Sequence, residues 1–275
     1  MKISIFFRDD NKKAALWAGK IESWFAKKHP KVKLAGARPN AVIVLGGDGA
    51  ILEAARVFQK NNPIILGLNL GYAGFLTSVR EPKKFLPALD KFLKGKYRRL
   101  ERMMIRAEVL RKNKIVFSTS ALNEVTVQNF LGMVELEADI EGHPVQYIHG
   151  SGVMVSTSTG STAYNLSAHG PIVMPDIKCM ILTEIMDHNI PTPSIVVKRD
   201  REISIRVLDF RKRGLLAIKN TGEAADVLLA SDGERIFPLE KNDVIKIRRS
   251  PRLVRFAELE PNYFFKSLRE KFAFR

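Results

Sequence analysis

The stretch AVIVLGGDGAILEAARVFQK, residues 41–60, decides the fold. It opens with the continuous apolar run of a buried strand. After a group of glycines it continues into ILEAARVFQK, whose apolar residues have helical spacing. Strands rich in Val, Ile and Leu that alternate with helices are typical of a parallel sheet covered on both faces. The stretch therefore predicts one strand and one helix of an α/β domain.

The same alternation continues on both sides of this stretch. KISIFF (2–7) and NPIILGLNLG (62–71) are further predicted strands, and residues 14–29 and 82–95 have the spacing of helices. After about Tyr97 the pattern changes to strands separated by turn residues, which is typical of a β-rich domain.

These patterns divide the chain into two domains. We expect an α/β domain with a parallel sheet over residues 1–98 and a β-rich, sandwich-like domain over 99–261. Two pieces of the second domain, residues 160–172 and 178–189, are predicted to be helical. The amphipathic tail, residues 262–275, is expected to pack back on the first domain.

The composition limits the classes of function. The 275 residues carry a net charge of +16, but the basic residues are scattered and no RNA-binding or zinc-finger motif accompanies them. We therefore expect no specific nucleic-acid partner. No apolar run is long enough to cross a bilayer, and the N-terminus lacks the pattern of a secretory signal. With Cys179 as its one cysteine, the chain is expected to be a soluble cytoplasmic protein without a membrane partner.

The loop Gly46-Gly47-Asp48-Gly49 lies directly between the strand and the helix of residues 41–60. Glycines here let a ligand approach main-chain N–H groups, and the positive end of the helix attracts anions. The loop lacks the Gly-Lys-Ser/Thr ending of a P-loop and the G-x-G-x-x-G spacing of a dinucleotide fingerprint. Because Asp48 would repel phosphate, its carboxylate is better explained as holding a hydroxyl group or a metal. The alternative is an ordinary N-cap of the helix.

Two further candidates follow or begin predicted strands. The loop GYAGF, residues 71–75, follows the third strand. Ligands bind beyond the carboxyl ends of parallel strands, so this loop points to the same crevice as Asp48. Asn123, beside Glu124, offers donors and an acceptor that suit the edge of a base or a ribose hydroxyl. The alternatives are a simple tight turn at 71–75 and a polar, solvent-facing strand at Asn123 and Glu124.

The fourth candidate is a stretch dense in hydroxyl groups. It is preceded by Gly150-Ser151-Gly152, and seven of the eight residues from 155 to 162 are Ser, Thr or Gly. Its hydroxyl and N–H groups are suited to surround a phosphate or a sugar. It runs into a predicted helix at Ala163 whose first turn would attract an anion. A hydrophobic strand before it and Tyr164 after it argue against a flexible linker, so we interpret residues 156–167 as a functional loop.

Together these motifs resemble those of the NAD kinase family. The resemblance rests on GGDG at 46–49, on Asn123-Glu124 and on GSTAYNLSAHGPI at 160–172, and it extends in order through Asp232-Gly233 to the tail. It implies a Mg²⁺-dependent kinase. Such an enzyme transfers the terminal phosphoryl group of ATP, or of polyphosphate, to the 2′-hydroxyl of the adenosine ribose of NAD.

The resemblance also implies roles for the domains and for individual residues. The α/β domain would bind nucleotide, the β-rich domain would bind NAD, and the active form would be a homodimer or a homotetramer. Asp48 matches the acidic residue that engages the 2′-hydroxyl and is expected to be the catalytic base. Donor phosphates with their Mg²⁺ would lie near the GGDG loop, and no residue is assigned as a metal ligand. The residues expected to bind the dinucleotide are Gly47, Gly49, Phe75, Asn123, Glu124, His149, Ser151, Thr162, Ala163, Tyr164, Asn165, Leu166 and Ser167.

Several positions depart from the family's pattern. Ser151 stands where the family commonly has Asp, Ala50 replaces the usual Thr, and Glu53 stands where a basic residue is frequent. His149 occupies a position that is often Arg and is associated with the choice between NAD and NADH. These departures leave the phosphoryl donor and the preference for NAD or NADH open.

Two other functions are alternatives. A lipid kinase of the diacylglycerol or sphingosine type shares the GGDG loop, and the charge of +16 favours an anionic membrane. Against it stands the GSTAYNLSAHGPI stretch, which resembles a dinucleotide site. A non-catalytic nucleotide-binding relative would follow from the missing Asp at Ser151, whereas the presence of Asp48 argues for catalysis. A binding assay that compares NAD with lipid vesicles distinguishes an NAD kinase from a lipid kinase. Formation of NADP distinguishes an NAD kinase from a non-catalytic relative.

Overall fold

The structure, a computed structural model, divides into two compact units. Unit 1 comprises Met1–Arg102 and Arg252–Arg275, and unit 2 comprises Met103–Pro251. The residues that the structure describes are 1–71, 74–187, 192–214, 216–217 and 224–272.

The borders of the units lie four and ten residues away from the domain borders expected from the sequence. The sequence placed the first border between residues 98 and 99 and the return of the chain at 262, whereas the units change after Arg102 and after Pro251. The reason is that β5 (Arg98–Arg111) and β17 (Val244–Glu258) are long strands that continue from one unit into the other. A change of pattern along the sequence marks where such a strand begins or ends, not where its partners change.

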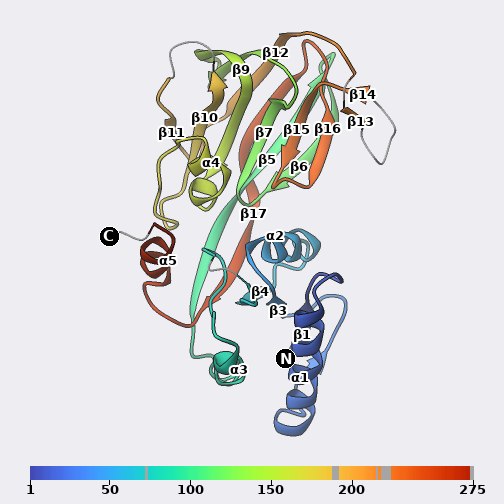
Figure 1. Ribbon diagram of the computed structural model, residues 1–275, viewed down its shortest axis with the longest axis vertical. Coiled ribbons are helices and arrows are strands. Elements are labelled where there is room, and N and C mark those ends of the chain that lie inside the picture. Colours follow the sequence, from blue (N-terminus) through green and yellow to red (C-terminus); the bar gives the residue numbers. More distant parts are fainter. Residues whose placement is uncertain (72–73, 188–191, 215, 218–223, 273–275) are drawn as a thin grey trace. The chain divides into compact units, whose positions relative to one another are not determined.

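Unit 1 contains the predicted parallel sheet, with the strand order β2-β1-β3-β4-β17. Strands β1, β3 and β4 are labelled in Figure 1. From β1 the chain proceeds to β2 on one side, and from β3 it proceeds to β4 on the other. The carboxyl ends of β1 and β3 therefore form the switch point at which open parallel sheets bind ligands. Besides the end of β17, the strands are β1 (Lys2–Phe6), β2 (Lys33–Leu34), β3 (Ala41–Leu45) and β4 (Ile64–Leu68).

Helices cover both faces of this sheet. Helices α1 (Lys12–Lys28) and α3 (Phe85–Leu93), the latter preceded by the short 3-10 helix η1 (Pro82–Lys84), bury residues three or four positions apart in one cluster with the strands. Helix α2 (Asp48–Val57) lies against β3 and β4. Its buried residues do not belong to that cluster, so it covers the opposite face, to which Val42 of β3 points.

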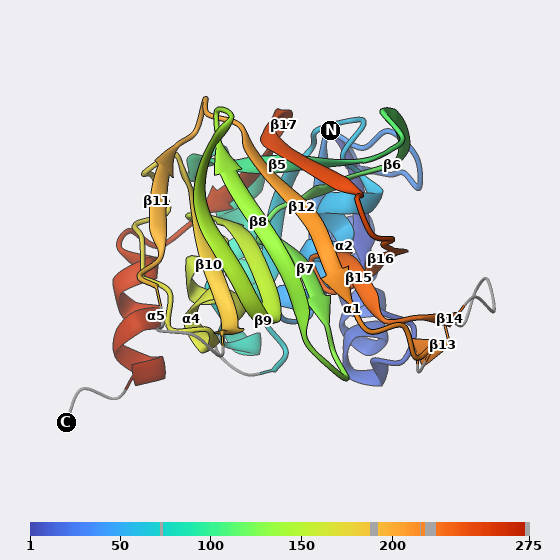
Figure 2. The same cartoon turned by 90° about the horizontal axis from the view of Figure 1, so that it is seen from above.

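Unit 2 is built of antiparallel strands, as the sequence predicted. Along the sheet the order is β16-β15-β7-β9-β8-β12-β17, and β10 also pairs with β9 and β11. Figure 2 shows β10, β9, β8 and β12 side by side in one layer. Besides β5 and β17, the strands are β6 (Lys114–Ala121), β7 (Glu124–Asn129), β8 (Val134–Ile140), β9 (His143–Thr157), β10 (Cys179–Asp187), β11 (Ile195–Lys198), β12 (Ile203–Phe210), β13 (Leu216–Ala217), β14 (Ala224–Ala225), β15 (Val227–Ser231) and β16 (Arg235–Pro238).

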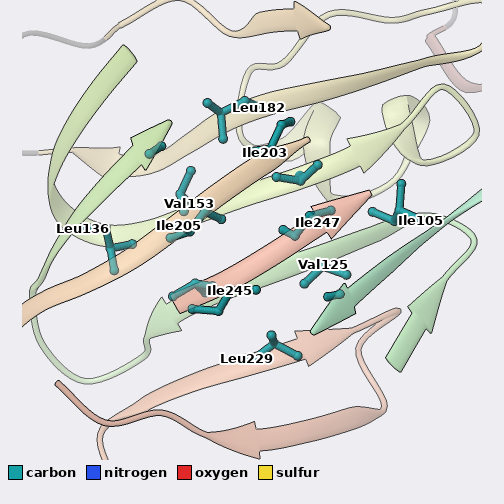
Figure 3. Close-up of a cluster of buried hydrophobic side chains, with 14 of the residues drawn as sticks. Ile105, Val125, Leu136, Val153, Leu182, Ile203, Ile205, Leu229, Ile245 and Ile247 are labelled. Carbon is teal, nitrogen blue, oxygen red and sulfur yellow. The ribbon is translucent and has the colours of Figure 1, made fainter. Parts of the chain in front are cut away.

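The core of unit 2 consists of the inward-facing residues of these strands. Along β8, for example, Val134, Leu136 and Ala138 are buried while the acidic residues between them are partly exposed. Figure 3 shows side chains from β5, β7, β8, β9, β10, β12, β15 and β17 gathered in one cluster. This alternation fixes the register of each strand, because a slip of one residue would turn the apolar set outward.

One prediction for unit 2 was wrong. Residues 178–189 were expected to be helical, but Cys179–Asp187 form strand β10, which is paired on both sides; positions 188 and 189 lie outside the described residues. Both faces of this strand are covered, so residues 179–185 are all buried and show no alternation that distinguishes a strand from a helix. In the other predicted piece, only η2 (Gly160–Thr162) and α4 (Tyr164–Ser167) are helical.

The net charge of the chain resides in unit 1. Unit 1 holds 27 of the 45 Lys and Arg residues but only 11 of the 29 Asp and Glu residues, an excess of 16, whereas unit 2 holds 18 of each. Basic residues that look scattered along the sequence are therefore concentrated in one unit. No helix in the described part of the chain has both the length and the apolar character to span a membrane.

Candidate active site

The GGDG loop joins β3 to α2 at the switch point of the parallel sheet. Gly47 is the N-cap of α2 and Asp48 is the first residue of the helix, so Asp48 does not occupy the N-cap position. The interpretation of Asp48 as an ordinary N-cap is therefore wrong. Its carboxylate is directed to a different segment of the chain.

That segment is the second glycine loop, which follows β4. The N–H of Phe75 donates to Oδ2 of Asp48 (2.8 Å), and the N–H of Leu76 donates to Oδ1 (3.1 Å). A Cβ atom at Gly74 would overlap the Asp48 carboxylate, so only glycine permits this approach. The two loops thus meet at one place, with one acceptor position left on each carboxylate oxygen.

Arg8 follows β1, the strand beside β3, and reaches the same loop. Its Nη2 donates to the carbonyl of Gly49 (3.5 Å), and its Nε forms an ion pair with Oε2 of Glu53 (2.9 Å). The acidic residue at Glu53 is therefore matched by a basic residue that follows the neighbouring strand. A guanidinium group, a carboxylate and the first turn of α2 lie together at the switch point.

In unit 2, a second aspartate holds the residues predicted to bind the dinucleotide. Oδ1 of Asp232 accepts from the N–H groups of Asn123 (2.8 Å) and Glu124 (3.3 Å), and its Oδ2 accepts from the N–H of Leu122 (2.8 Å). In return, the N–H of Asp232 donates to the carbonyl of Glu124 (3.0 Å). The loss of water around the Asp232 carboxyl raises its pKa to about 6, although these three amides oppose the shift.

The carbonyl groups of the same segment are held from the other side. Oγ1 of Thr157 donates to the carbonyl of Leu122 (2.6 Å), and the N–H of Thr157 donates to that of Asn123 (2.8 Å). Oγ of Ser156 also donates to the carbonyl of Asn123 (3.2 Å). The backbone around Asn123 and Glu124 is therefore fixed on both edges.

Glu124 is buried without a full set of partners. It is 8% exposed, and its Oε2 has no hydrogen-bond partner among the described residues. Burial, and after it the charge of Asp232, raises the pKa of Glu124 to about 8. At neutral pH a carboxyl with this raised pKa is mostly protonated, and in that form it can donate a hydrogen bond. This capacity differs from the acceptor-only character of an ionised glutamate.

The hydroxyl-rich stretch is less open than its composition suggests. Ser156 to Ser161 are buried, and the hydroxyls of Ser156, Thr157 and Ser161 donate to backbone carbonyls. They stabilise the chain where we had expected them to surround a ligand. The helix at Ala163 is a single four-residue turn, α4, and offers little dipole to an anion.

Within this stretch the predicted ligand-binding residues have different environments. Thr162, Ala163 and Leu166 are partly exposed, and Tyr164 and Ser167 are exposed. Asn165 is fully buried: its Nδ2 donates to the carbonyl of Pro171 (3.1 Å), and its Oδ1 accepts from Thr183 (2.8 Å). Asn165 therefore holds the stretch in shape.

His149 and Ser151 lie in strand β9, so Gly150-Ser151-Gly152 is not a loop. A Cβ atom at Gly152, whose φ is +151°, would overlap the carbonyl oxygen of Val127 on β7. His149 is one of the residues around a cavity of about 460 Å³, and Nδ1 of His149 is 3.9 Å from Oε1 of Glu135. None of the other predicted site residues lines this cavity.

Three supporting residues were missed as site residues from the sequence. The position of Arg8 beside Gly49 follows only from the order of the strands in the sheet. The role of Asp232 follows from a hydrogen-bond partner that is more than 100 residues away in the sequence. The third is Gln128 on β7, whose Nε2 donates to Oη of Tyr164 (3.3 Å). Of these three residues, only Asp232 could have been found from the sequence, because the Asp232-Gly233 pair is part of the family resemblance.

Comparisons with known proteins agree with this architecture. The family model for the ATP-NAD kinase N-terminal domain matches residues 5–97, and that for the C-terminal domain matches residues 122–259. The chain is 40% identical over 232 residues to the NAD kinase of Moorella thermoacetica, covering 84% of this chain and 70% of that one. With the NAD kinase of Geobacter metallireducens it shares 34% identity over 289 aligned positions, covering 98% and 97% of the two chains.

Among solved structures, a yeast NADH kinase complexed with NADH has the same fold. The TM-score is 0.87 at 18% identity, covering all of this chain and 88% of that one. The matches in sequence put the chain among the phosphotransferases. Within that class it belongs to the NAD kinase family, with a match to each of the family's two domains.

Proposed function

We propose that this protein transfers the terminal phosphoryl group of ATP to the 2′-hydroxyl of the adenosine ribose of NAD, which yields NADP. Membership of the NAD kinase family supports the reaction. The structural observation that carries the proposal is the Asp48 carboxylate. It stands at the carboxyl end of β3, held by two amides, and each of its oxygens keeps room for one further hydrogen bond.

In the proposed mechanism Asp48 receives the proton of the 2′-hydroxyl. The ribose oxygen forms a bond to the terminal phosphorus, the bond from that phosphorus to the bridging oxygen breaks, and ADP leaves with the electron pair. Because phosphoryl transfer depends on alignment and on neutralised charge, a fixed carboxylate and nearby cations are the main contribution of the protein. The two amide hydrogen bonds supply the fixed orientation of Asp48.

We propose that the donor phosphates lie beside Gly47 and Gly49, at the first turn of α2. Arg8 supports this placement, because its guanidinium group adjoins Gly49. The excess of 16 positive charges in unit 1 attracts a nucleotide triphosphate to this unit. Mg²⁺ would enter with ATP, held by phosphate oxygens and water, and would neutralise the charge of the phosphates. The described residues contain no cluster of three His, Cys, Asp or Glu side chains suited to hold a metal of its own.

For the dinucleotide we propose contacts from the residues that the family resemblance assigns to it. Asn123, protonated Glu124 and the exposed Tyr164 supply donors, acceptors and a ring. Asn165 supports this surface from beneath. The remaining proposed contacts are Gly47, Gly49, Phe75, His149, Ser151, Thr162, Ala163, Leu166 and Ser167.

Further properties of the family pattern are proposed with the reaction. We propose that residues 1–98 with the tail 262–275 form the nucleotide-binding domain and that 99–261 form the NAD-binding domain. The active form is proposed to be a homodimer or homotetramer in the cytoplasm, where ATP and NAD are available. Polyphosphate as the donor would use the same cations. The lipid-kinase alternative is not favoured, because both family models and the named relatives are NAD kinases.

The experiment is a direct assay of product. The purified protein is incubated with NAD, ATP and Mg²⁺, and NADP is measured by a coupled dehydrogenase. Parallel reactions contain NADH in place of NAD, or polyphosphate in place of ATP. We expect NADP to accumulate with NAD and ATP in the wild type and to be strongly reduced in Asp48→Asn. Binding of NAD without any NADP or NADPH from any donor would instead identify a non-catalytic relative.

A further inference from the structure

Helix α5 (Tyr263–Phe272), which follows β17, packs on the second glycine loop of unit 1. Its two fully buried positions, Tyr263 and Ser267, are 7% and 0% exposed and lie one helical turn apart on one face. On the same side, the ring of Phe264 lies 5.6 Å from that of Phe75. The contact between α5 and the loop is therefore specific and largely closed to water.

Arg80, five residues after Phe75, is committed to this helix. Its Nε donates to Oη of Tyr263 (2.9 Å), its Nη2 donates to Oγ of Ser267 (2.5 Å), and its Nη1 forms an ion pair with Glu270. The guanidinium group also lies 4.5 Å from the centre of the Tyr263 ring. Thr77 adds a hydrogen bond to Oη of Tyr263 (3.0 Å). Both the loop and its exit are thus bound to α5.

A single peptide group connects this contact to the catalytic carboxylate. Oγ of Ser267 lies 3.0 Å from the carbonyl oxygens of both Gly74 and Tyr263 and shares its one proton between them. The N–H of Phe75, which belongs to the same peptide group as the Gly74 carbonyl, donates to Oδ2 of Asp48 (2.8 Å). The peptide group is planar and rigid, so a rotation that breaks one of these hydrogen bonds also misaligns the other. Polarisation along such a chain strengthens both bonds.

We propose that α5 is a positioning element for catalysis, in which Ser267 orients the Asp48 carboxylate through the Gly74–Phe75 peptide group. Tyr263 and Arg80 keep Ser267 in place, and the pairing of β17 with β4 anchors the start of the helix in the same sheet. This inference rests on the proposed role of Asp48. It predicts that changes in α5 alter the chemical step while leaving the binding of both substrates intact.

The test is a double-mutant cycle between Ser267→Ala and Asp48→Asn, measured as kcat and as KM for NAD and for ATP. We expect Ser267→Ala to lower kcat roughly tenfold, since small displacements of a reacting group have effects of this size. Both KM values should stay within about twofold, as expected when only the transition state loses an interaction. In the Asp48→Asn background the same substitution should have no further effect on kcat. The matched control is Arg269→Ala, an exposed position of the same helix, with kcat unchanged.

The outcomes separate this inference from the proposed function. An equal loss of kcat with and without Asp48, or a loss that appears only in KM, would overturn the positioning role while leaving the kinase intact. Wild-type turnover in Asp48→Asn would overturn the catalytic role of Asp48 and, with it, this inference. If Ser267→Ala does not fold, Tyr263→Phe replaces it, because this change keeps the ring and removes only the hydroxyl that binds Arg80 and Thr77.

Discussion

Two aspartates, one in each unit, hold the backbone of a distant segment in the same way but differ in what remains for a ligand. Asp48 accepts two amides, one on each oxygen, from the segment after Gly74. Asp232 accepts three amides from the segment before β7, and its own amide is bound in return. A carboxylate accepts about four hydrogen bonds. Asp48 therefore keeps one position on each oxygen, whereas Asp232 keeps one in all.

The difference teaches how to separate a reacting carboxylate from a supporting one. Each aspartate belongs to a glycine-containing motif, Gly46-Gly47-Asp48-Gly49 for one and Asp232-Gly233 for the other. The presence of such a motif therefore does not distinguish the two residues. What distinguishes them is the acceptor capacity left over and the surrounding charge, which is strongly positive in unit 1 and balanced in unit 2. These differences support the proposed catalytic role of Asp48, whereas Asp232 fixes the backbone around Asn123 and Glu124.

The largest expected effect is on catalysis by Asp48→Asn. The amide cannot take up the hydroxyl proton, and its NH₂ group opposes an N–H donor of the loop. We expect kcat to fall about a hundredfold or more, the range for losing a general base. The urea midpoint should fall less than in Asp232→Ala, because only one amide of the loop loses its acceptor. Steady-state assays of NADP formation check the prediction, and a variant that loses stability in place of turnover would make Asp48 resemble Asp232.

The converse is expected for Asp232→Ala. Three buried amides, those of Leu122, Asn123 and Glu124, lose their acceptor, and each such group costs about 1–3 kcal/mol when left unpaired. We expect a loss of about 3 kcal/mol or more in the free energy of unfolding, measured by urea denaturation. Asp200→Ala, an exposed position in unit 2, is the control. Unchanged stability together with abolished turnover would show that the two aspartates have similar roles.

Gly74→Ala tests the comparison by changing the loop that holds the Asp48 carboxylate. The new Cβ atom displaces the Asp48 carboxylate, which is the movable end of a side chain, so activity should suffer more than folding. We expect kcat to fall roughly tenfold, with the thermal midpoint within a few degrees of the wild type. Gly36→Ala, where nothing lies within 4 Å of the added atom, should keep full activity.

The smallest expected effect is the pH dependence that Glu124 gives to stability. Its pKa of about 8 in the folded chain exceeds the ordinary value of 4.5, so unfolding releases a proton between these limits. The group therefore reduces stability as pH rises from about 4.5 to about 8. The variant Glu124→Gln has no carboxyl group at this position and therefore lacks this pH dependence. Its free energy of unfolding, relative to that of the wild type, should increase by at least about 1 kcal/mol between pH 5 and pH 8. Urea midpoints at both values test this; parallel pH profiles would contradict it.

The sequence predicted the architecture of unit 1 well because each strand and helix has its own period. Residues 41–60 show an apolar run, glycines and a helical repeat in one stretch, and their structure follows that order. Strand β10 was assigned wrongly because a strand covered on both faces has no period to detect. The fold class was therefore predictable, and this element was not.

The candidate site was predictable in its motifs but not in its contacts. Asp48 and Glu124 are visible in the sequence, whereas the partners that determine their chemistry, Phe75 and Asp232, are 27 and 108 residues away. Residue type alone also does not decide the role of Asn165, because an amide in a polar stretch serves a ligand or the protein equally well. Only the hydrogen bonds in the structure show that Asn165 is already satisfied.

The discontinuity of unit 1 has a consequence for the synthesis of the chain. The ribosome makes residues 1–102 first, then all of unit 2, and only afterwards the 24 residues from 252 to 275 that complete unit 1. Until these residues emerge, Arg80 has none of its partners on α5 and the peptide group beside Asp48 is held from one side only. On the proposed roles of Asp48 and Ser267, a chain that ends before residue 252 is expected to lack activity.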